Sequence, residues 1–234
     1  MRNFKFSISI LLLSAVALAG CSTDRNKSQN SGAMNFINMV SPGGKKLLPV
    51  ENGPVRNISE DPLADLDTFT LKINGLVDSP YTLTWDQIMA MKKIDTDTIL
   101  MYCVEGWEVW GRWKGVSVSE LLSEAGVMPE GKYVLFRSPG DYTTSLPVSY
   151  LEKYNAILAY EVNGDTLSYD NGFPLRLVAF GKFGYKWAKC VNVLEVTDTS
   201  RIGFWEEHGY SDSANVPIKR RRFYEGADAM PLRY

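Results

Sequence analysis

Cys103 is the residue of this chain best suited to bind a soft metal. It ends a mostly apolar run, residues 98–103, which is predicted to be a buried strand, and it opens the motif CVEGW. A cysteine at a strand end, just before a glycine turn, can direct its thiolate into a cavity. Thiolate suits soft metals and metals that already carry sulfur ligands. A buried structural cysteine, or a disulfide with Cys190 in an exported protein, would also explain the residue.

A second group of candidate binding residues lies at positions 171–189, where the chain reads NGFPLR and then GKFGYKWAK. One arginine, Arg176, and three lysines, Lys182, Lys186 and Lys189, fall in this span. A guanidinium fork and ammonium groups together suit a phosphate, and glycines let the backbone approach a ligand closely. A solvated basic hairpin is the alternative, but the interleaved glycines and aromatic residues favour a binding loop.

Short strands and short helices must position these groups. Alternating and apolar runs predict strands at residues 69–73, 98–103, 133–136, 156–162, 175–180 and 189–196. The dipeptide Asn74-Gly75 is predicted to turn the chain after the first strand. Helices are predicted from Thr84 as a cap, from a capping box at Ser117 to Gly126, and at 147–154 after a proline. This mixture predicts a strand-rich α+β domain and not a doubly wound sheet.

Several common chemistries are excluded by the composition. The single histidine, His208, rules out a zinc site with several histidine ligands. The chain has no CxxCH motif for a c-type haem and no glycine-rich nucleotide motif. The net charge of −2 does not suggest nucleic acid as a partner. The basic cluster at residues 219–222 is interpreted as a solvated tail, with contact to anionic lipid as the alternative.

Residues 1–20 are expected to be a signal peptide. Their apolar stretch is too short for a permanent membrane span, and Leu-Ala-Gly-Cys at 18–21 is similar to the lipobox of bacterial lipoproteins. That similarity implies an acyl anchor of the palmitate type on Cys21. The protein would then be held on a bacterial envelope membrane, facing away from the cytoplasm. Residues 21–61 are predicted to be a flexible tether, whose late portion could wrap the domain formed by residues 62–234.

The motifs of the domain occur in the order found in a known family. CVEGW, WKGV at 113–116, AYE at 159–161, NGFPLRLV at 171–178, FGKFGYKWAK at 180–189 and GFWE at 203–206 resemble the sulfite-oxidase-type molybdopterin-binding domain. The bacterial branch with the catalytic subunit of periplasmic protein-methionine-sulfoxide reductase is the most similar. The resemblance implies a mixed α+β, sulfite-oxidase-type fold and an oxidoreductase with a molybdenum-molybdopterin cofactor.

The resemblance also implies roles for individual residues. Cys103 would bind molybdenum beside the pterin dithiolene, and Glu105 matches the acidic residue near the metal in that branch. The other implied cofactor contacts are Ser138, Asn171, Arg176, Trp187, Ala188 and Lys189. Cys190 has no such role in the family and is interpreted as a core residue. The cofactor would supply the redox chemistry, and the protein would supply orientation and electrostatics.

The predicted reaction is oxygen-atom transfer, with reduction of a sulfoxide or similar oxide favoured over sulfite oxidation. Sulfite oxidases carry an arginine pair soon after the metal cysteine, where this chain has Val104 and Glu105, and a carboxylate repels sulfite. The substrate would be a small molecule or of the methionine-sulfoxide type. Because the chain has no haem or flavin motif, a separate electron-transfer partner, haem-containing or quinone-linked, is expected.

A cofactor-free envelope lipoprotein is the second hypothesis. The N-terminal segment carries no twin-arginine pair, which is the signal that exports folded members of the family, and unfolded export would deliver apoprotein. The same fold would then serve as a ligand-binding or protein-binding module. The joint presence of Cys103, Asn171, Arg176 and Lys189 favours the enzyme, because an unused pocket has no physical need of that set.

Overall fold

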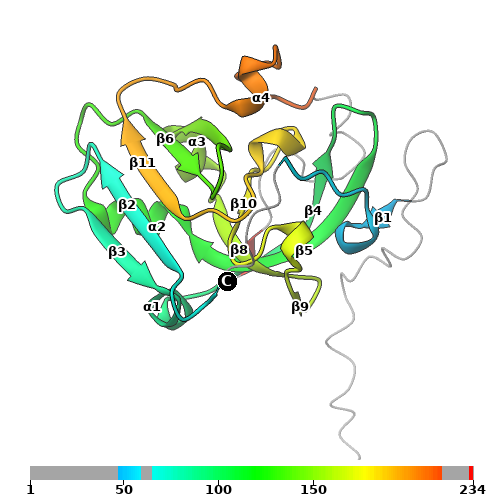
Figure 1. The fold of residues 1–234 in the computed structure, drawn as a ribbon, viewed down its shortest axis with the longest axis horizontal. Helices are drawn as coiled ribbons and strands as arrows, with labels where there is room; N and C mark the ends of the chain where they lie inside the picture. Colours follow the sequence, from blue (N-terminus) through cyan, green and yellow to red (C-terminus); the bar gives the residue numbers. More distant parts are fainter. Residues whose placement is uncertain (1–46, 59–64, 218–231, 234) are drawn as a thin grey trace, which may run out of the picture. The chain divides into compact units, whose positions relative to one another are not determined.

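The computed structural model describes residues 47–58, 65–217 and 232–233, and Figure 1 shows how their strands and helices are arranged. In this part of the chain the strands form two sheets. The first sheet has the order β10-β8-β5-β4-β12, with β1 paired to β5 and β9 paired to β8. Its strands are β1 (Leu48–Pro49), β4 (Ile94–Tyr102), β5 (Glu108–Ser117), β8 (Ile157–Val162), β9 (Asp165–Thr166), β10 (Arg176–Val178) and β12 (Leu232–Arg233).

The second sheet has the order β3-β2-β11-β6-β7. Its strands are β2 (Thr70–Gly75), β3 (Tyr81–Thr84), β6 (Tyr133–Arg137), β7 (Thr143–Pro147) and β11 (Val193–Thr197). Strand β11 runs parallel to β2 and antiparallel to β6. A strand from the end of the domain therefore lies between two strands from earlier in the chain.

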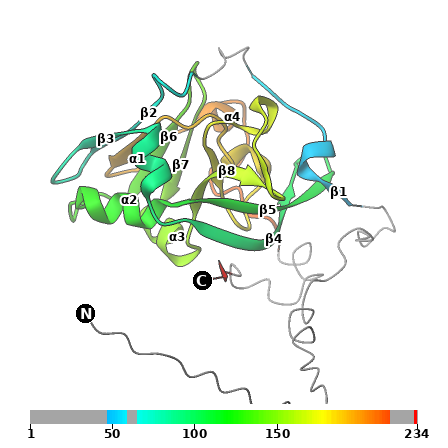
Figure 2. The same cartoon turned by 90° about the horizontal axis from the view of Figure 1, so that it is seen from below.

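The helices are short and connect the strands. They are α1 (Trp85–Ala90), α2 (Val118–Ala125), α3 (Val148–Lys153) and α4 (Phe204–Glu207), with single 3-10 turns at η2 (Val50–Asn52), η3 (Tyr169–Asn171) and η4 (Gly184–Lys186). Figure 2 shows α1, α2 and α3 gathered beside the strands of the second sheet. The strand-rich α+β class predicted from the sequence is confirmed.

Local sequence explains where the helices begin and end. Thr84 accepts a hydrogen bond from the amide of Gln87, whose side chain accepts one from the amide of Thr84, which completes a capping box before α1. The Ser117 hydroxyl accepts a hydrogen bond from the Glu120 amide at the start of α2. Gly126 ends this helix in the left-handed conformation, with φ of +68°. These predicted helix ends are confirmed.

Both sheets contribute to one apolar core. Leu71 and Ile73 come from the second sheet, Trp113 and Ile157 from the first, and Leu121 from α2, and each is at most 1% exposed. Burying one such side chain contributes roughly 1.5–3 kcal/mol. This core fixes the strand ends and loops that carry polar residues such as Cys103 and Arg176.

The predicted turn at Asn74-Gly75 is wrong. Both residues belong to β2, where they pair with Glu195 and Val196 of β11. The tertiary pairing overrides the local turn preference of the dipeptide. Gly75 has φ of +87°, and a Cβ atom at this position would lie 2.1 Å from the carbonyl oxygen of Val196. Glycine is needed here for close approach between two strands.

Gly75→Ala is therefore expected to destabilise the fold by about 2–4 kcal/mol, since it adds a steric clash to the strain of a positive φ. Gly164→Ala is the matched control, because Gly164 has φ of +96° but nothing within 4 Å of the added Cβ. The control should lose only about 1–2 kcal/mol. Urea denaturation of both variants measures the difference, and equal losses would refute the close-approach explanation.

The segment 47–58 packs against the domain. Leu47 and Val50 are buried, and β1 pairs with β5. The late portion of the predicted tether thus wraps the domain, which was one of the options that the sequence left open. The predictions for residues 1–20, the anchor at Cys21 and the basic cluster at 219–222 lie outside the described residues. Among the residues described, no helix has the length and apolar character to cross a membrane.

Candidate cofactor-binding site

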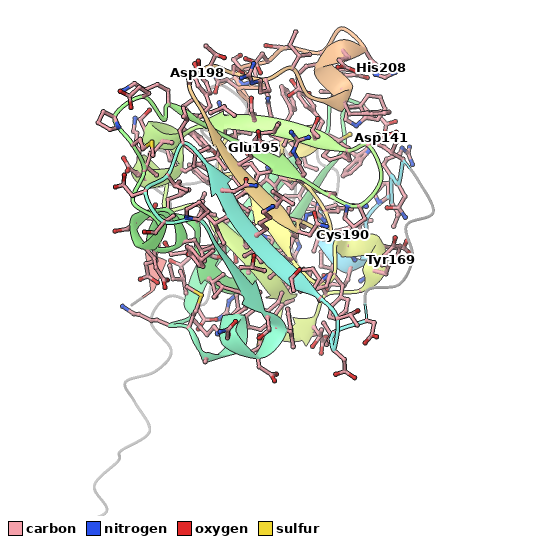
Figure 3. All side chains as sticks on the ribbon, turned by 60° about the vertical axis from the view of Figure 1, so that its left-hand side comes forward. Asp141, Tyr169, Cys190, Glu195, Asp198 and His208 are labelled. Atoms are coloured by element: carbon pink, nitrogen blue, oxygen red, sulfur yellow. The ribbon has the colours of Figure 1, made fainter. Side chains whose placement is uncertain are left out.

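One cavity of about 370 Å³ brings together most of the residues predicted to carry chemistry. The predicted residues that line it are Cys103, Glu105, Ser138, Asn171, Arg176, Trp187 and Lys189. Ala188 is the exception, because it is fully buried and its carbonyl accepts a hydrogen bond from the Leu177 amide. Two further lining residues, Tyr169 and Cys190, are labelled in Figure 3.

A tight turn places Cys103 at the cavity wall. The Cys103 amide donates to the Trp107 carbonyl at 2.9 Å, and the Gly106 amide donates to the Cys103 carbonyl at 3.1 Å. Gly106, with φ of +91°, lets the chain reverse from β4 into β5. Partial burial raises the pKa of the Cys103 thiol. A metal that binds there must displace a proton from sulfur.

The Glu105 carboxylate lies beside this thiol and is held by two donors. Trp107 Nε1 donates to Oε2 at 2.8 Å, and Arg56 contacts both carboxylate oxygens, at 3.2 and 3.0 Å. The Trp107 hydrogen bond and then the Arg56 guanidinium lower the pKa of Glu105. Cys103 Sγ lies 3.8 Å from Glu105 Oε2. The carboxylate is therefore ionised, and Arg56 balances its charge.

Two further lining residues, Arg176 and Lys189, are cationic. Arg176 is buried, and its Nη1 donates to the Asn171 carbonyl at 2.9 Å, while Nη2 lies 3.0 Å from Met101 Sδ. Within the described residues, Arg176 Nε has no hydrogen-bond partner. Lys189 Nζ donates to Asn57 Oδ1 at 2.8 Å and to the Arg56 carbonyl at 3.0 Å. Desolvation lowers the pKa of Arg176 to about 10 and that of Lys189 to about 8.

The other two lysines of the basic span do not reach the cavity. Lys182 Nζ donates to the Ser213 carbonyl and to Asn215 Oδ1. Lys186 is completely buried and forms an ion pair with Glu206. Of the four basic residues that the sequence suggested for phosphate binding, only Arg176 and Lys189 line the cavity.

Three predicted contacts also organise the loop that holds Lys189. The Ser138 hydroxyl donates to the carbonyl of Lys189. Trp187 is buried, and its Nε1 donates to the Lys182 carbonyl while its ring packs against Trp113 at 5.7 Å. Asn171 directs its backbone carbonyl to Arg176 and its side-chain amide to the hydroxyl of Ser168.

Cys190 is buried, as expected of a core residue, but it also lines the cavity. Both cysteines in the described part of the chain, Cys103 and Cys190, are thiols and not halves of a disulfide. The disulfide that the sequence left open is therefore not formed.

The sequence did not identify two polar contributors, Arg56 and Asn57. They lie in the segment predicted to be a tether, which has no periodic pattern. Asn57 contacts both Lys189 and Asp170, at 2.8 Å each. An arginine next to an asparagine was the only available signal, and it is too common in tethers to be selective.

These residues fit a molybdopterin. The described residues contain no group of three or more His, Cys, Asp or Glu side chains that could hold a metal ion. A metal bound to Cys103 must therefore receive most of its ligands from a cofactor, and the dithiolene of a molybdopterin supplies such ligands. Arg176 and Lys189 make no ion pair with a carboxylate among the described residues. A buried guanidinium with an unpartnered Nε donor, together with a partly buried ammonium group, suits a phosphate group.

The comparison with known proteins agrees with this chemistry. Residues 57–205 match the family described as oxidoreductase molybdopterin binding domain. The chain is similar to the putative protein-methionine-sulfoxide reductase subunit YedZ1 of Azospira oryzae, with 35% identity over 63% of this chain and 56% of the relative. It is also similar to the uncharacterized oxidoreductase YuiH of Bacillus subtilis, with 32% identity over 68% of this chain and 80% of that one.

Two further similarities involve longer proteins. The protein-methionine-sulfoxide reductase catalytic subunit MsrP of Gluconobacter oxydans is 28% identical, over 72% of this chain and 62% of MsrP. Among solved structures, the sulfane dehydrogenase SoxCD of Paracoccus pantotrophus has a TM-score of 0.59 and 28% identity, over 62% of this chain and 42% of that chain. The chain thus spans only part of these proteins: 56% of YedZ1, 62% of MsrP and 42% of the SoxCD chain.

The chain belongs to the oxidoreductase molybdopterin binding domain family. The predicted sulfite-oxidase-type fold and the molybdopterin cofactor are confirmed at this level. The family places the protein in the class of molybdenum-dependent oxidoreductases.

The low pKa of Lys189 predicts a pH dependence for anion binding. Lys189 is cationic below about pH 8 and loses its proton above that pH, whereas phosphate becomes a dianion near neutral pH. Binding of inorganic phosphate to cofactor-free protein should therefore weaken on the order of tenfold between pH 7.5 and 9.5. Isothermal titration calorimetry can measure this. Lys189→Met should bind weakly at both pH values, and an unchanged affinity of the wild type at pH 9.5 would contradict the assignment.

Proposed function

We propose that this protein is an envelope reductase that uses its molybdenum cofactor to remove the oxygen atom from a sulfoxide or a similar neutral oxide. One observation carries the proposal: a single cavity is lined by a thiol and by two cations, Arg176 and Lys189, that pair with no carboxylate among the described residues. That arrangement suits a metal and a phosphate that belong to one cofactor. Two relatives bear the names of a putative subunit and of the catalytic subunit of a protein-methionine-sulfoxide reductase, and these names support the substrate class.

The residues of the chain would divide the work of holding this cofactor. Cys103 would bind the molybdenum, and Arg176 and Lys189 would bind the phosphate. Asn57 and Asn171, which line the same cavity, would contact the pterin. When bound, the cofactor supplies two-electron oxygen-atom chemistry. The protein fixes the orientation of the cofactor and limits the access of water.

The charges near Cys103 favour a neutral substrate. Glu105 and Arg56 form a pair without net charge. This balance weakens the repulsion of sulfite that the sequence alone suggested, but it also leaves no spare cation beside the thiol to attract an anion. The cavity rim carries exposed apolar side chains, including Val55, Val104 and Tyr210. A neutral oxide with an apolar body matches this entrance better than a dianion does.

The cellular setting remains part of the proposal. An acyl chain on Cys21 would hold the protein on a membrane of the bacterial envelope, outside the cytoplasm. Electrons would come from a separate haem-containing or quinone-linked protein. The described residues include no second redox centre such as a disulfide or a cluster of metal ligands.

The test uses protein purified from a host that makes the molybdenum cofactor. Metal analysis should give about one molybdenum per chain, and reduced viologen dye should be oxidised when a methyl sulfoxide is added. Cytochrome c reduction by sulfite is the parallel assay. Molybdenum-loaded protein that oxidises sulfite and reduces no sulfoxide would overturn the proposed direction, and protein without molybdenum would overturn the enzyme itself.

A further inference from the structure

Five aromatic residues form a closed group on one wall of the cavity. Ring centroids lie 6.1 Å apart for Tyr142 and Phe204, 5.5 Å for Phe204 and Trp205, 5.4 Å for Trp205 and Tyr210, and 5.4 Å for Tyr210 and Tyr185. The Tyr142 hydroxyl donates to the Tyr185 carbonyl and closes the group. We call these five residues the aromatic belt. All five line the cavity, and none is fully buried.

The belt combines residues that are distant in the sequence. Tyr142 precedes β7, Tyr185 belongs to η4, and the other three belong to α4 or to the residues just after it. Their rings form a surface without formal charge, in contrast to the Arg56–Glu105 pair and the Arg176–Lys189 end of the same cavity. Core packing alone would bury these rings, so their partial exposure towards the cavity indicates a surface for a ligand.

A buried ion pair holds the belt in place. Lys186 has a side chain that is 0% exposed, and its Nζ pairs with Glu206 of α4 and, at 3.2 Å, with Asp212. The same ammonium group donates to the Ser145 carbonyl, and the hydroxyl of Thr144 donates to Glu206. These contacts tie η4 and α4 to β7. These contacts therefore hold the backbone segments that carry Tyr185, Phe204 and Trp205.

The chemistry of this surface suits an alkyl sulfoxide. Such a group has an apolar body, a polarisable sulfur and one strong acceptor oxygen. Sulfur makes favourable contacts with aromatic rings, each contributing about 0.3–1.5 kcal/mol. The rings can hold the alkyl arms while the oxygen is directed towards Cys103, which lines the same cavity. A substrate with only methyl substituents covers little of this surface.

We propose that the aromatic belt is the substrate-specificity surface, and that it selects sulfoxides with an extended alkyl arm, such as the side chain of an oxidised methionine, over dimethyl sulfoxide. The inference rests on the proposed function. It adds which residues recognise the substrate and which part of the substrate they recognise.

The experiment compares N-acetylmethionine sulfoxide with dimethyl sulfoxide as substrates of the holoenzyme. Trp205→Leu and Tyr210→Leu should each raise KM for N-acetylmethionine sulfoxide about tenfold, as expected for the loss of one or two ring contacts. The kcat values and the KM for dimethyl sulfoxide should change less than about threefold. Ile202→Ala is the control, because Ile202 is 64% exposed and does not line the cavity. Equal changes for both substrates, or no change, would overturn the assignment.

A binding measurement separates this inference from the proposed function. Calorimetric titration of the holoenzyme with N-acetylmethionine sulfoxide, without reductant, should show binding that weakens about tenfold in both variants. If the wild type binds this sulfoxide without reducing it, and the variants bind it about tenfold more weakly, the proposed function fails and the belt assignment stands. If the wild type reduces it and the variants keep their KM and affinity, the belt assignment fails alone. Molybdenum content and thermal unfolding identify any variant that is merely misfolded, and Tyr210, at the exposed end of the belt, is the safer substitution.

Discussion

Replacing Cys103 by serine should remove molybdenum from the protein and abolish its oxidoreductase activity. Among the described residues no group of three or more His, Cys, Asp or Glu side chains could hold the metal in place of this thiol. A serine hydroxyl is a hard ligand that keeps its proton at neutral pH, so it is a poorer ligand than a thiolate for a metal that carries sulfur ligands. We expect less than about one tenth of the wild-type molybdenum content, and activity lowered about a thousandfold.

The fold should survive this change. The turn that contains Cys103 is made by backbone hydrogen bonds to Gly106 and Trp107, and serine can keep both. Cofactor-free Cys103→Ser protein should therefore unfold at the same temperature as cofactor-free wild type. Cys190→Ser is the matched variant, since Cys190 is the other thiol in the cavity lining, and it should retain molybdenum. Wild-type metal content in the Cys103 variant would show that the metal is held elsewhere.

The sequence predicted the parts of this site that follow regular elements. Cys103 was placed correctly because a strand pattern ends at it and a glycine turn follows. The short helices were predicted from their caps, as at Thr84 and Gly126. In each case the signal is local, so neighbouring residues alone determine the structure. Residue types within the run of glycines and aromatic residues pointed equally to Arg176 and to three lysines, and only the family resemblance singled out Lys189, which lines the cavity.

Contacts between distant segments could not be predicted in the same way. Strand β5 lies at the centre of the first sheet, but its two glycines, Gly111 and Gly115, interrupt the alternating pattern. An added Cβ at Gly115 would lie 2.1 Å from the Leu158 carbonyl, which is a constraint set by β8. Arg56 likewise reaches Glu105 across 49 residues. No local pattern encodes such a pairing, so the charge balance beside Cys103 became visible only in the fold.

The buried ion pair behind the aromatic belt leads to the second large prediction. Lys186→Met should lower the free energy of unfolding by about 3–5 kcal/mol, because it leaves the Glu206 carboxylate buried without its counter-ion. The side chains of Lys186 and Glu206 are only 0% and 3% exposed, so water cannot replace the lost ammonium group. The loss of Asp212 as a second partner adds little, since its side chain is 53% exposed.

A double variant distinguishes the lost charge pair from lost packing. Lys186→Met with Glu206→Gln removes both formal charges and leaves a neutral amide that can still accept the Thr144 hydroxyl. If the unpaired carboxylate causes the damage, the double variant should be more stable than Lys186→Met alone by at least about 1 kcal/mol. Urea denaturation of the cofactor-free proteins measures each step of the cycle. A double variant that is no more stable than the single one would assign the loss to packing around the lysine stem, and the belt would then be held by shape and not by charge.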